Sequence, residues 1–215
     1  MTDPWFSLQL SLFVAVVATG IVAVVGGAVG YLLARYEFWG KELVDALCTL
    51  PLILPPTVVG FYLLGGLGKR GWVYALTGWT PLFTVWAAVI AAVVMALPLM
   101  VKTTRAALES VDRTYENVAY TLGQSRFQTF FRVTLPLAWK GIAAGVVLSF
   151  ARALGEFGAT LMLAGNIPGK TQTMPLAIYQ ATQTGEESLA LGLALLLTLT
   201  ALGGLLLSQQ LGQRG

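Results

Sequence analysis

An arginine and a glutamate four positions apart are the residues best placed to do chemistry in this sequence. Arg152 and Glu156 are the two charged residues of the apolar run Gly141–Ala164. Ionisable side chains inside a membrane are costly and normally face the protein interior in pairs. On one helix face, an i,i+4 pair can partly neutralise itself. Two roles remain open: a structural ion pair that fixes helix packing, or part of a transport pathway or its gate.

A second unusual stretch holds three prolines within six positions, Pro51, Pro55 and Pro56, followed by Thr57. Each proline lacks an N–H donor and clashes with the preceding helical turn, so the stretch cannot be a regular helix. Irregular backbone at membrane depth is tolerated only against protein or a water-filled cavity. We therefore expect Pro55, Pro56 and Thr57 to face a pathway or the bundle interior. A kink without a transport role is the alternative.

The sequence offers little for catalysis or metal binding. It has no histidine, the commonest general base and metal ligand, and its one cysteine, Cys48, cannot form an intrachain disulfide. It also has no Gly-x-x-x-x-Gly-Lys-Ser/Thr loop for nucleotide phosphates. We expect no catalytic residue, no metal site and no cofactor in this chain, which disfavours a membrane-embedded enzyme.

The amino-acid composition indicates that the chain lies in a lipid bilayer. The 215 residues are 56% hydrophobic and 11% charged, with a mean hydropathy of +0.75. Soluble domains carry about 25% charged residues, and a chain with so little charge could not cover itself in water. The sequence predicts an all-α integral membrane protein in contact with the lipid bilayer. It excludes a disordered chain, a nucleic-acid-binding domain and a disulfide scaffold.

Five apolar runs are long enough to cross a bilayer, which takes about 20 helical residues. A sixth crossing remains open, because Thr171–Gly185 is polar and short but could dip into the membrane. We treat residues 1–215 as a single transmembrane domain. The predicted spans are Leu8–Ala34, Ala46–Gly68, Leu82–Val101, Gly141–Ala164 and Ser188–Leu207.

Basic residues are divided unequally between alternate loops. One set of loops holds nine of them and the other set holds three. Because cytoplasmic loops are enriched in lysine and arginine, the N-terminus is predicted outside and the C-terminus in the cytoplasm. The nine are Arg35, Lys41, Lys102, Arg105, Arg113, Arg126, Arg132, Lys140 and Arg214; the three are Lys69, Arg70 and Lys170.

Small residues recur every four positions in the first span, a spacing that lets another backbone approach closely. Ordinary helix packing and a dedicated dimer seam are both compatible with this pattern. One series is Ala15, Thr19, Ala23 and Gly27, and a second pair is Gly26 and Gly30.

Residues 102–140 form the longest polar region. Four apolar residues at i, i+3, i+4 and i+7 predict an amphipathic helix, and Gly123 suits its C-terminus. Three phenylalanines predict a second short helix, and Pro136 closes the loop before the next span. Docking onto another protein is the preferred interpretation, and a membrane-surface helix the alternative. The apolar residues are Tyr115, Val118, Ala119 and Leu122, then Phe127, Phe130 and Phe131.

This loop resembles the signature loop of ABC importer permeases. That family has an E-A-A triplet, a glycine four positions beyond its last alanine, then a hydrophobic residue ten positions after the glycine, followed by x-Leu-Pro. Here Asn117 and Val118 replace the first two residues of the triplet, and Glu116 lies one position early. The resemblance implies a type I ABC importer permease fold with 102–140 as its cytoplasmic coupling loop. The ATPase-coupling residues would be Glu116, Asn117, Ala119, Gly123, Leu135 and Pro136.

Two further blocks, Leu50–Gly60 and Phe150–Tyr179, resemble the molybdate/tungstate branch of these permeases. Sulfate permeases carry related blocks and remain an alternative. The resemblance implies a homodimeric pore in the cell membrane. Two ATPase subunits would bind the ATP, and an extracytoplasmic binding protein would deliver the oxyanion. Molybdate and tungstate, similar tetrahedral dianions, are not distinguished.

An ion-coupled secondary transporter is the alternative of a different class. It predicts ion-coupling carboxylates or an internal inverted repeat, and the sequence shows neither.

Overall fold

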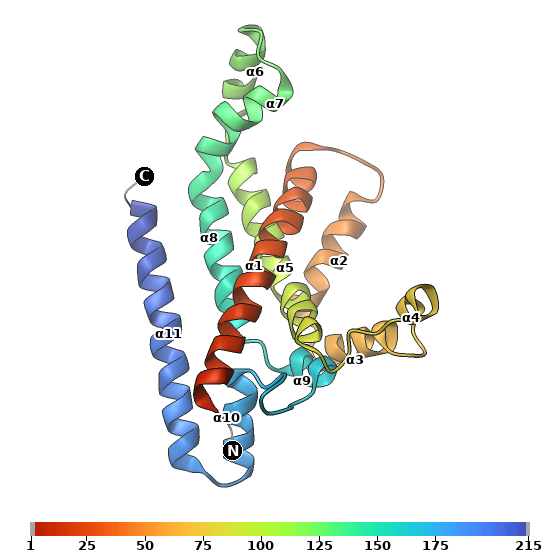
Figure 1. Cartoon of the computed structure of the whole chain (residues 1–215). Helices are drawn as coiled ribbons and strands as arrows, with labels where there is room; N and C mark the ends of the chain where they lie inside the picture. Colours follow the sequence, from red (N-terminus) through yellow and green to blue (C-terminus); the bar gives the residue numbers. More distant parts are fainter. Residues whose placement is uncertain (1–2, 214–215) are drawn as a thin grey trace.

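The computed structural model describes residues 3–213, with side chains as far as residue 206, and its regular structure is entirely helical in that range (Figure 1). This confirms the predicted all-α class. Arg214 lies outside the described residues. The elements are α1 (Pro4–Arg35), α2 (Lys41–Ile53), α3 (Pro56–Leu67), α4 (Trp72–Thr77), α5 (Val85–Glu109), α6 (Arg113–Thr121), α7 (Arg126–Thr129), a π-helical turn (Phe130–Thr134), α8 (Leu135–Leu154), α9 (Gly158–Ala164), α10 (Met174–Gln183) and α11 (Glu187–Gln213).

Four helical stretches are long and apolar enough to cross a membrane, namely α1, α5, the rod 126–154 and α11. Helix α2 and the segment Pro56–Thr77, which contains α3 and α4, make a fifth crossing if the bent pair counts as one span. Figure 1 shows α6, α7 and the α1–α2 connection at one end of the bundle, and α4, α9 and α10 at the other. The polar segment Thr171–Gly185, for which a sixth crossing was left open, contains α10, and this helix packs against α1 and α11.

The proline-rich stretch breaks the second span as predicted. Pro51 is accommodated inside α2, which ends at Ile53, and Pro56 begins α3 with Pro55 as its extended N-cap. The segments on the two sides of the break are inclined by 118°. A proline at the first helical position fits because the N–H that it lacks would have no partner there.

The prediction that Gly141–Ala164 forms one span is wrong. The crossing begins at Arg126 and ends at Leu154, and residues 158–164 form the separate helix α9. The prediction that Pro136 closes the loop is also wrong, since helix continues through it. The wider π-helical turn directly before Pro136 gives the proline ring room in an otherwise unbroken rod.

Helix α5 is the centre of the bundle, because it packs against α1, α2, α8 and α9. Gly26 and Gly30 of α1 lie at its contact with α5, and both are buried. A Cβ on Gly30 would lie 2.8 Å from Thr104 Cβ and 2.9 Å from the Val101 carbonyl oxygen. The face of α1 that packs internally therefore includes the second small-residue pair, whereas Ala23 and Gly27 are only partly buried.

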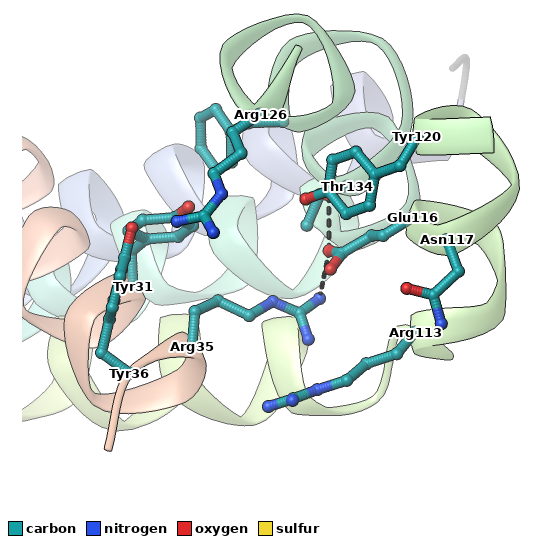
Figure 2. Close-up of a pocket in the computed structure, with 10 residues that line it drawn as sticks. Tyr31, Arg35, Tyr36, Arg113, Glu116, Asn117, Tyr120, Arg126 and Thr134 are labelled. Atoms are coloured by element: carbon teal, nitrogen blue, oxygen red, sulfur yellow. Dashed lines mark hydrogen bonds and ion pairs between the residues drawn. The ribbon is translucent and has the colours of Figure 1, made fainter. Parts of the chain in front are cut away.

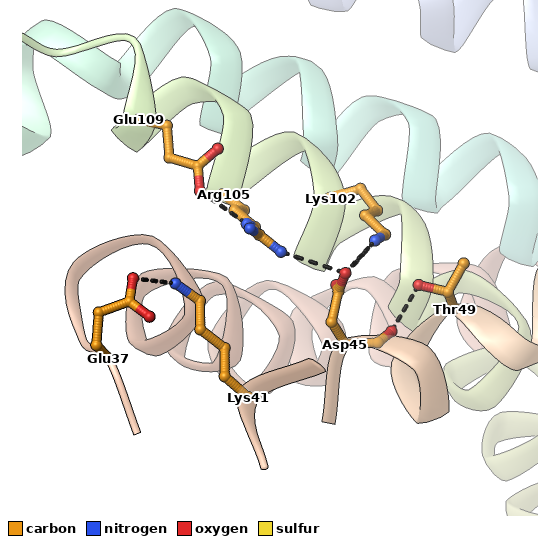
Figure 3. Close-up of polar contacts among 7 residues, drawn as sticks. All are labelled: Glu37, Lys41, Asp45, Thr49, Lys102, Arg105 and Glu109. Atoms are coloured by element: carbon orange, nitrogen blue, oxygen red, sulfur yellow. Dashed lines mark hydrogen bonds and ion pairs between the residues drawn. The ribbon is translucent and has the colours of Figure 1, made fainter. Parts of the chain in front are cut away.

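Charged side chains attach α2 to the bundle, since this helix has no buried residue. Asp45 accepts hydrogen bonds of 2.8 Å from Lys102 Nζ and lies 3.2 Å from Arg105 Nη1 (Figure 3). Arg105 also pairs with Glu109 at 2.8 Å. The polar end of α5 therefore holds α2 by ion pairs, where an apolar contact would normally do so.

The α1–α5 contact predicts a difference between two alanine substitutions in the same helix. Gly30→Ala should destabilise the fold by about 1–3 kcal/mol, since the new methyl group overpacks the contact with α5. Gly20→Ala is the matched control, because nothing lies within 4 Å of a Cβ there. Thermal unfolding of the detergent-solubilised protein measures both. An equal loss in the two variants would show that the contact is not responsible.

Candidate functional site

The segment from α6 to α7 has well-defined local stop and start signals. Asp112 caps α6, and its Oδ1 accepts a hydrogen bond of 2.8 Å from the Thr114 N–H, which lowers the pKa of Asp112. Gly123 follows α6 with φ +81°, as its predicted role at a helix end requires. Ser125 and Gln128 then form a reciprocal capping box that begins α7.

The two sides of α6 differ in their surroundings. Tyr115, Val118 and Leu122 are 59%, 52% and 76% exposed and form an apolar outer face. Ala119 is buried and Glu116 is largely buried, on the side turned towards the bundle. The predicted amphipathic helix is thus present, with its larger apolar side chains pointing away from the protein.

Glu116 is the anchor of α6. Its Oε1 lies 2.7 Å from Arg35 Nη2 at the end of α1 and accepts a hydrogen bond of 2.7 Å from Thr134 Oγ1 (Figure 2). Thr134 directly precedes the predicted pair Leu135 and Pro136, which form the first turn of α8. One carboxylate therefore joins α6, α1 and the π-helical turn.

Asn117, the other predicted residue of the altered triplet, lies beside Glu116 on the wall of a cavity of about 360 Å³ (Figure 2). Arg35, the partner of Glu116 in this wall, was not identified as a site residue from the sequence, although it was counted among the basic residues. Its position at the polar end of an apolar run was a signal, but the sequence did not reveal its partner.

Arg152 and Glu156 form the predicted ion pair, with Arg152 Nη1 2.7 Å from Glu156 Oε2. The predicted shared helix face is wrong, because α8 ends at Leu154 and Glu156 lies in the following turn. Glu156 Oε1 accepts a hydrogen bond of 2.9 Å from the Ala159 N–H, which joins the turn to α9. The glutamate side chain is 2% exposed and the arginine side chain 26%.

The structure brings the two predicted pathway groups to one place. Gly158 lies two residues beyond Glu156, and a Cβ on it would lie 2.9 Å from Pro56 Cβ and 3.3 Å from the Thr57 nitrogen. Pro55 and Thr57 are exposed, and Pro56 is partly buried. The start of α3, after its prolines, therefore packs against the first residue of α9, which follows the turn that contains Glu156.

A polar network that was missed at the sequence level lies next to α9. Gln172 Nε2 donates hydrogen bonds to Asn166 Oδ1 at 2.9 Å and to Gln180 Oε1 at 2.6 Å. Gln172 is 1% exposed, and its own Oε1 has no hydrogen-bond partner among the described residues. The signal was the run of amides and threonines at 166–173, which no periodic pattern explained.

Among residues 3–213, no group of three or more acidic, cysteine or histidine side chains is arranged to hold a metal ion.

Comparison with known proteins gives consistent matches. Residues 26–214 match the family of binding-protein-dependent transport system inner membrane components. The molybdenum transport system permease protein ModB of Escherichia coli (strain K12) is 46% identical, over 99% of this chain and 96% of the relative. The sulfate transport system permease protein CysW of Synechocystis sp. is 35% identical, over 97% and 76%. The MetNI methionine ABC transporter in an inward-facing form shares the fold, with TM-score 0.79, 17% identity, and 100% and 99% coverage.

The burial of the Arg152–Glu156 pair predicts unequal effects of removing either charge. Arg152→Gln leaves a buried carboxylate without its counterion and should cost about 3–5 kcal/mol of stability. Glu156→Gln should cost less, since the arginine is more exposed and the amide oxygen can still accept from the Ala159 N–H. Thermal unfolding in detergent should show that the double variant is more stable than Arg152→Gln alone. Simple additivity of the two changes would refute the pairing.

Proposed function

The chain belongs to the family of binding-protein-dependent transport system inner membrane components, the permeases of ABC importers, and on that premise we propose that it forms the membrane pathway of a molybdate or tungstate importer. Its fold is that of a type I ABC importer permease. The observation that carries the proposed cargo is the 46% identity to a molybdenum permease over nearly the full length of both chains. Sulfate is the second candidate, since a sulfate permease is 35% identical.

In this proposal two copies of the chain enclose one pathway. The junction of α3 with the turn after α8 lines it, since Pro55, Thr57 and the Arg152 guanidinium are at least partly accessible there. A guanidinium group can bind the oxygens of a tetrahedral dianion in pairs. The buried Glu156 partly neutralises the charge of Arg152 and so limits the net positive charge of this part of the pathway. The partner copy covers part of the exposed apolar surface of α2 and α3, which includes Leu47, Ile53 and Phe61.

The ATP-hydrolysing subunits dock at the α6 end of the bundle. In each copy of the chain, the apolar outer face of α6 and the exposed Phe127 of α7 form a compact surface for one ATPase subunit. The two copies therefore bind two ATPase subunits. Three basic residues, Lys69, Arg70 and Lys170, lie at the other end, and eight lie at this end. The eight are Arg35, Lys41, Lys102, Arg105, Arg113, Arg126, Arg132 and Lys140. The positive-inside rule therefore favours a cytoplasmic α6 and an external N-terminus. An external binding protein delivers the oxyanion at the α9–α10 end.

The proposed function predicts selective, ATP-dependent uptake. Proteoliposomes containing the permease, its ATPase and its binding protein should accumulate molybdate only when ATP is supplied. Excess tungstate should compete, because the two oxyanions are nearly equal in size and charge, whereas an equal excess of sulfate should compete weakly. The reverse order, with sulfate as the stronger competitor, would assign the chain to sulfate transport.

Gly123 provides a test of the coupling segment. A β-branched residue at φ +81° is strained, so Gly123→Val should displace α7 relative to α6. Gly123→Asn is the matched control, because asparagine tolerates this conformation and the Cβ meets no atom within 4 Å. Both variants should reach normal membrane levels. Only the valine variant should lose ATPase co-purification and uptake, and full retention of both by that variant would exclude coupling through this segment.

A further inference from the structure

The wall of the cavity beside α6 has more positively charged side chains than negatively charged ones. Three arginines line it from three different elements: Arg35 from α1, Arg113 from α6 and Arg126 from α7. Glu116 is the one carboxylate in the lining, so the formal charge of the wall is +2. The volume of about 360 Å³ falls within the range of small-ligand pockets.

Arg35 supplies a second observation that points to a ligand. Its side chain is 9% exposed, and among the described residues its Nε reaches no hydrogen-bond acceptor, although Nη2 pairs with Glu116. A buried donor without an acceptor is unfavourable, and an anionic oxygen in the cavity would satisfy it. Figure 2 shows Arg35 reaching from α1 towards α6 while Arg113 reaches back from α6.

The other charged groups of the wall are available to the same ligand. Within residues 3–213, neither Arg113 nor Arg126 takes part in an ion pair. Both side chains are exposed, and Tyr36 and Tyr120 also line the cavity. Planar guanidinium groups bind the oxygens of phosphate-like groups in pairs.

We propose that this cavity binds an anionic, phosphate-like oxyanion group, which is either a free tetrahedral anion or the headgroup of an anionic lipid. The site goes beyond the proposed transport function and does not depend on the transported cargo. A bound anion would connect α1, α6 and α7 in addition to the Glu116 contact.

The site leaves the apolar outer face of α6 free. The α6 residues in the cavity wall, Arg113, Glu116, Asn117 and Tyr120, follow the i, i+3, i+4, i+7 spacing of one helix face. Tyr115, Val118 and Leu122 occupy the opposite face by the same spacing. An anion and a partner protein can therefore bind α6 at the same time.

The test uses the full chain in nanodiscs, with separate arms for the two sources of the anion. In discs of phosphatidylcholine, inorganic phosphate is titrated while hydrogen exchange is followed over 113–122. In phosphate-free discs that also contain phosphatidylglycerol, native mass spectrometry counts the retained anionic lipid. Saturable protection in the first arm identifies a free anion, and retention in the second identifies a lipid.

Arg113→Gln/Arg126→Gln should weaken binding at least about tenfold in the arm that is positive. Arg113→Lys/Arg126→Lys should retain part of the affinity, because charge remains while the paired geometry is lost. Arg132→Gln is the matched control, since this exposed arginine lies outside the cavity wall. Absence of binding in both arms would overturn the proposal. So would unchanged binding in the double glutamine variant, or an equal loss in Arg132→Gln.

Discussion

The close approach of α1 and α5 is the contact on which the rest of the bundle depends. In a lipid environment helices gain nothing from hiding apolar surface, so association relies on tight backbone packing and on polar contacts. Gly26 and Gly30 permit that packing, and a Cβ at either position would lie within about 3 Å of α5. Helices α2, α8 and α9 then assemble on the remaining sides of α5.

Polar contacts position the elements that α5 cannot hold by packing alone. Asp45 attaches α2 through Lys102 and Arg105, and Glu116 attaches α6 through Arg35 and Thr134. At the other end Glu156 joins the end of α8 to α9. In each case a carboxylate joins its own segment to at least one other segment of the chain. These carboxylates therefore set the geometry of the two regions to which we assign function.

The sequence predicted the features that depend on local pattern. The apolar spans of α1, α5 and α11, the proline break near Pro55 and the helix that ends before Gly123 follow from composition, periodicity and backbone geometry. The sequence did not predict which face of α1 packs, because that depends on the shape of α5. It also misplaced Glu156 on a helix, since Gly155 and the Ala159 N–H determine where α8 ends. The Arg35–Glu116 contact required the tertiary structure, which joins residues far apart in the chain.

The π-helical turn at Phe130–Thr134 sets the rotational phase between the two ends of the rod 126–154. An α-helix advances about 100° per residue, so each residue accommodated in that turn changes which way α7 faces relative to α8. Residues 126–154 form one continuous helical stretch, and about 29 residues at 1.5 Å each make it roughly 43 Å long. A movement imposed on Phe127 would therefore be transmitted along this helical stretch to Arg152 as a rotation about the helix axis.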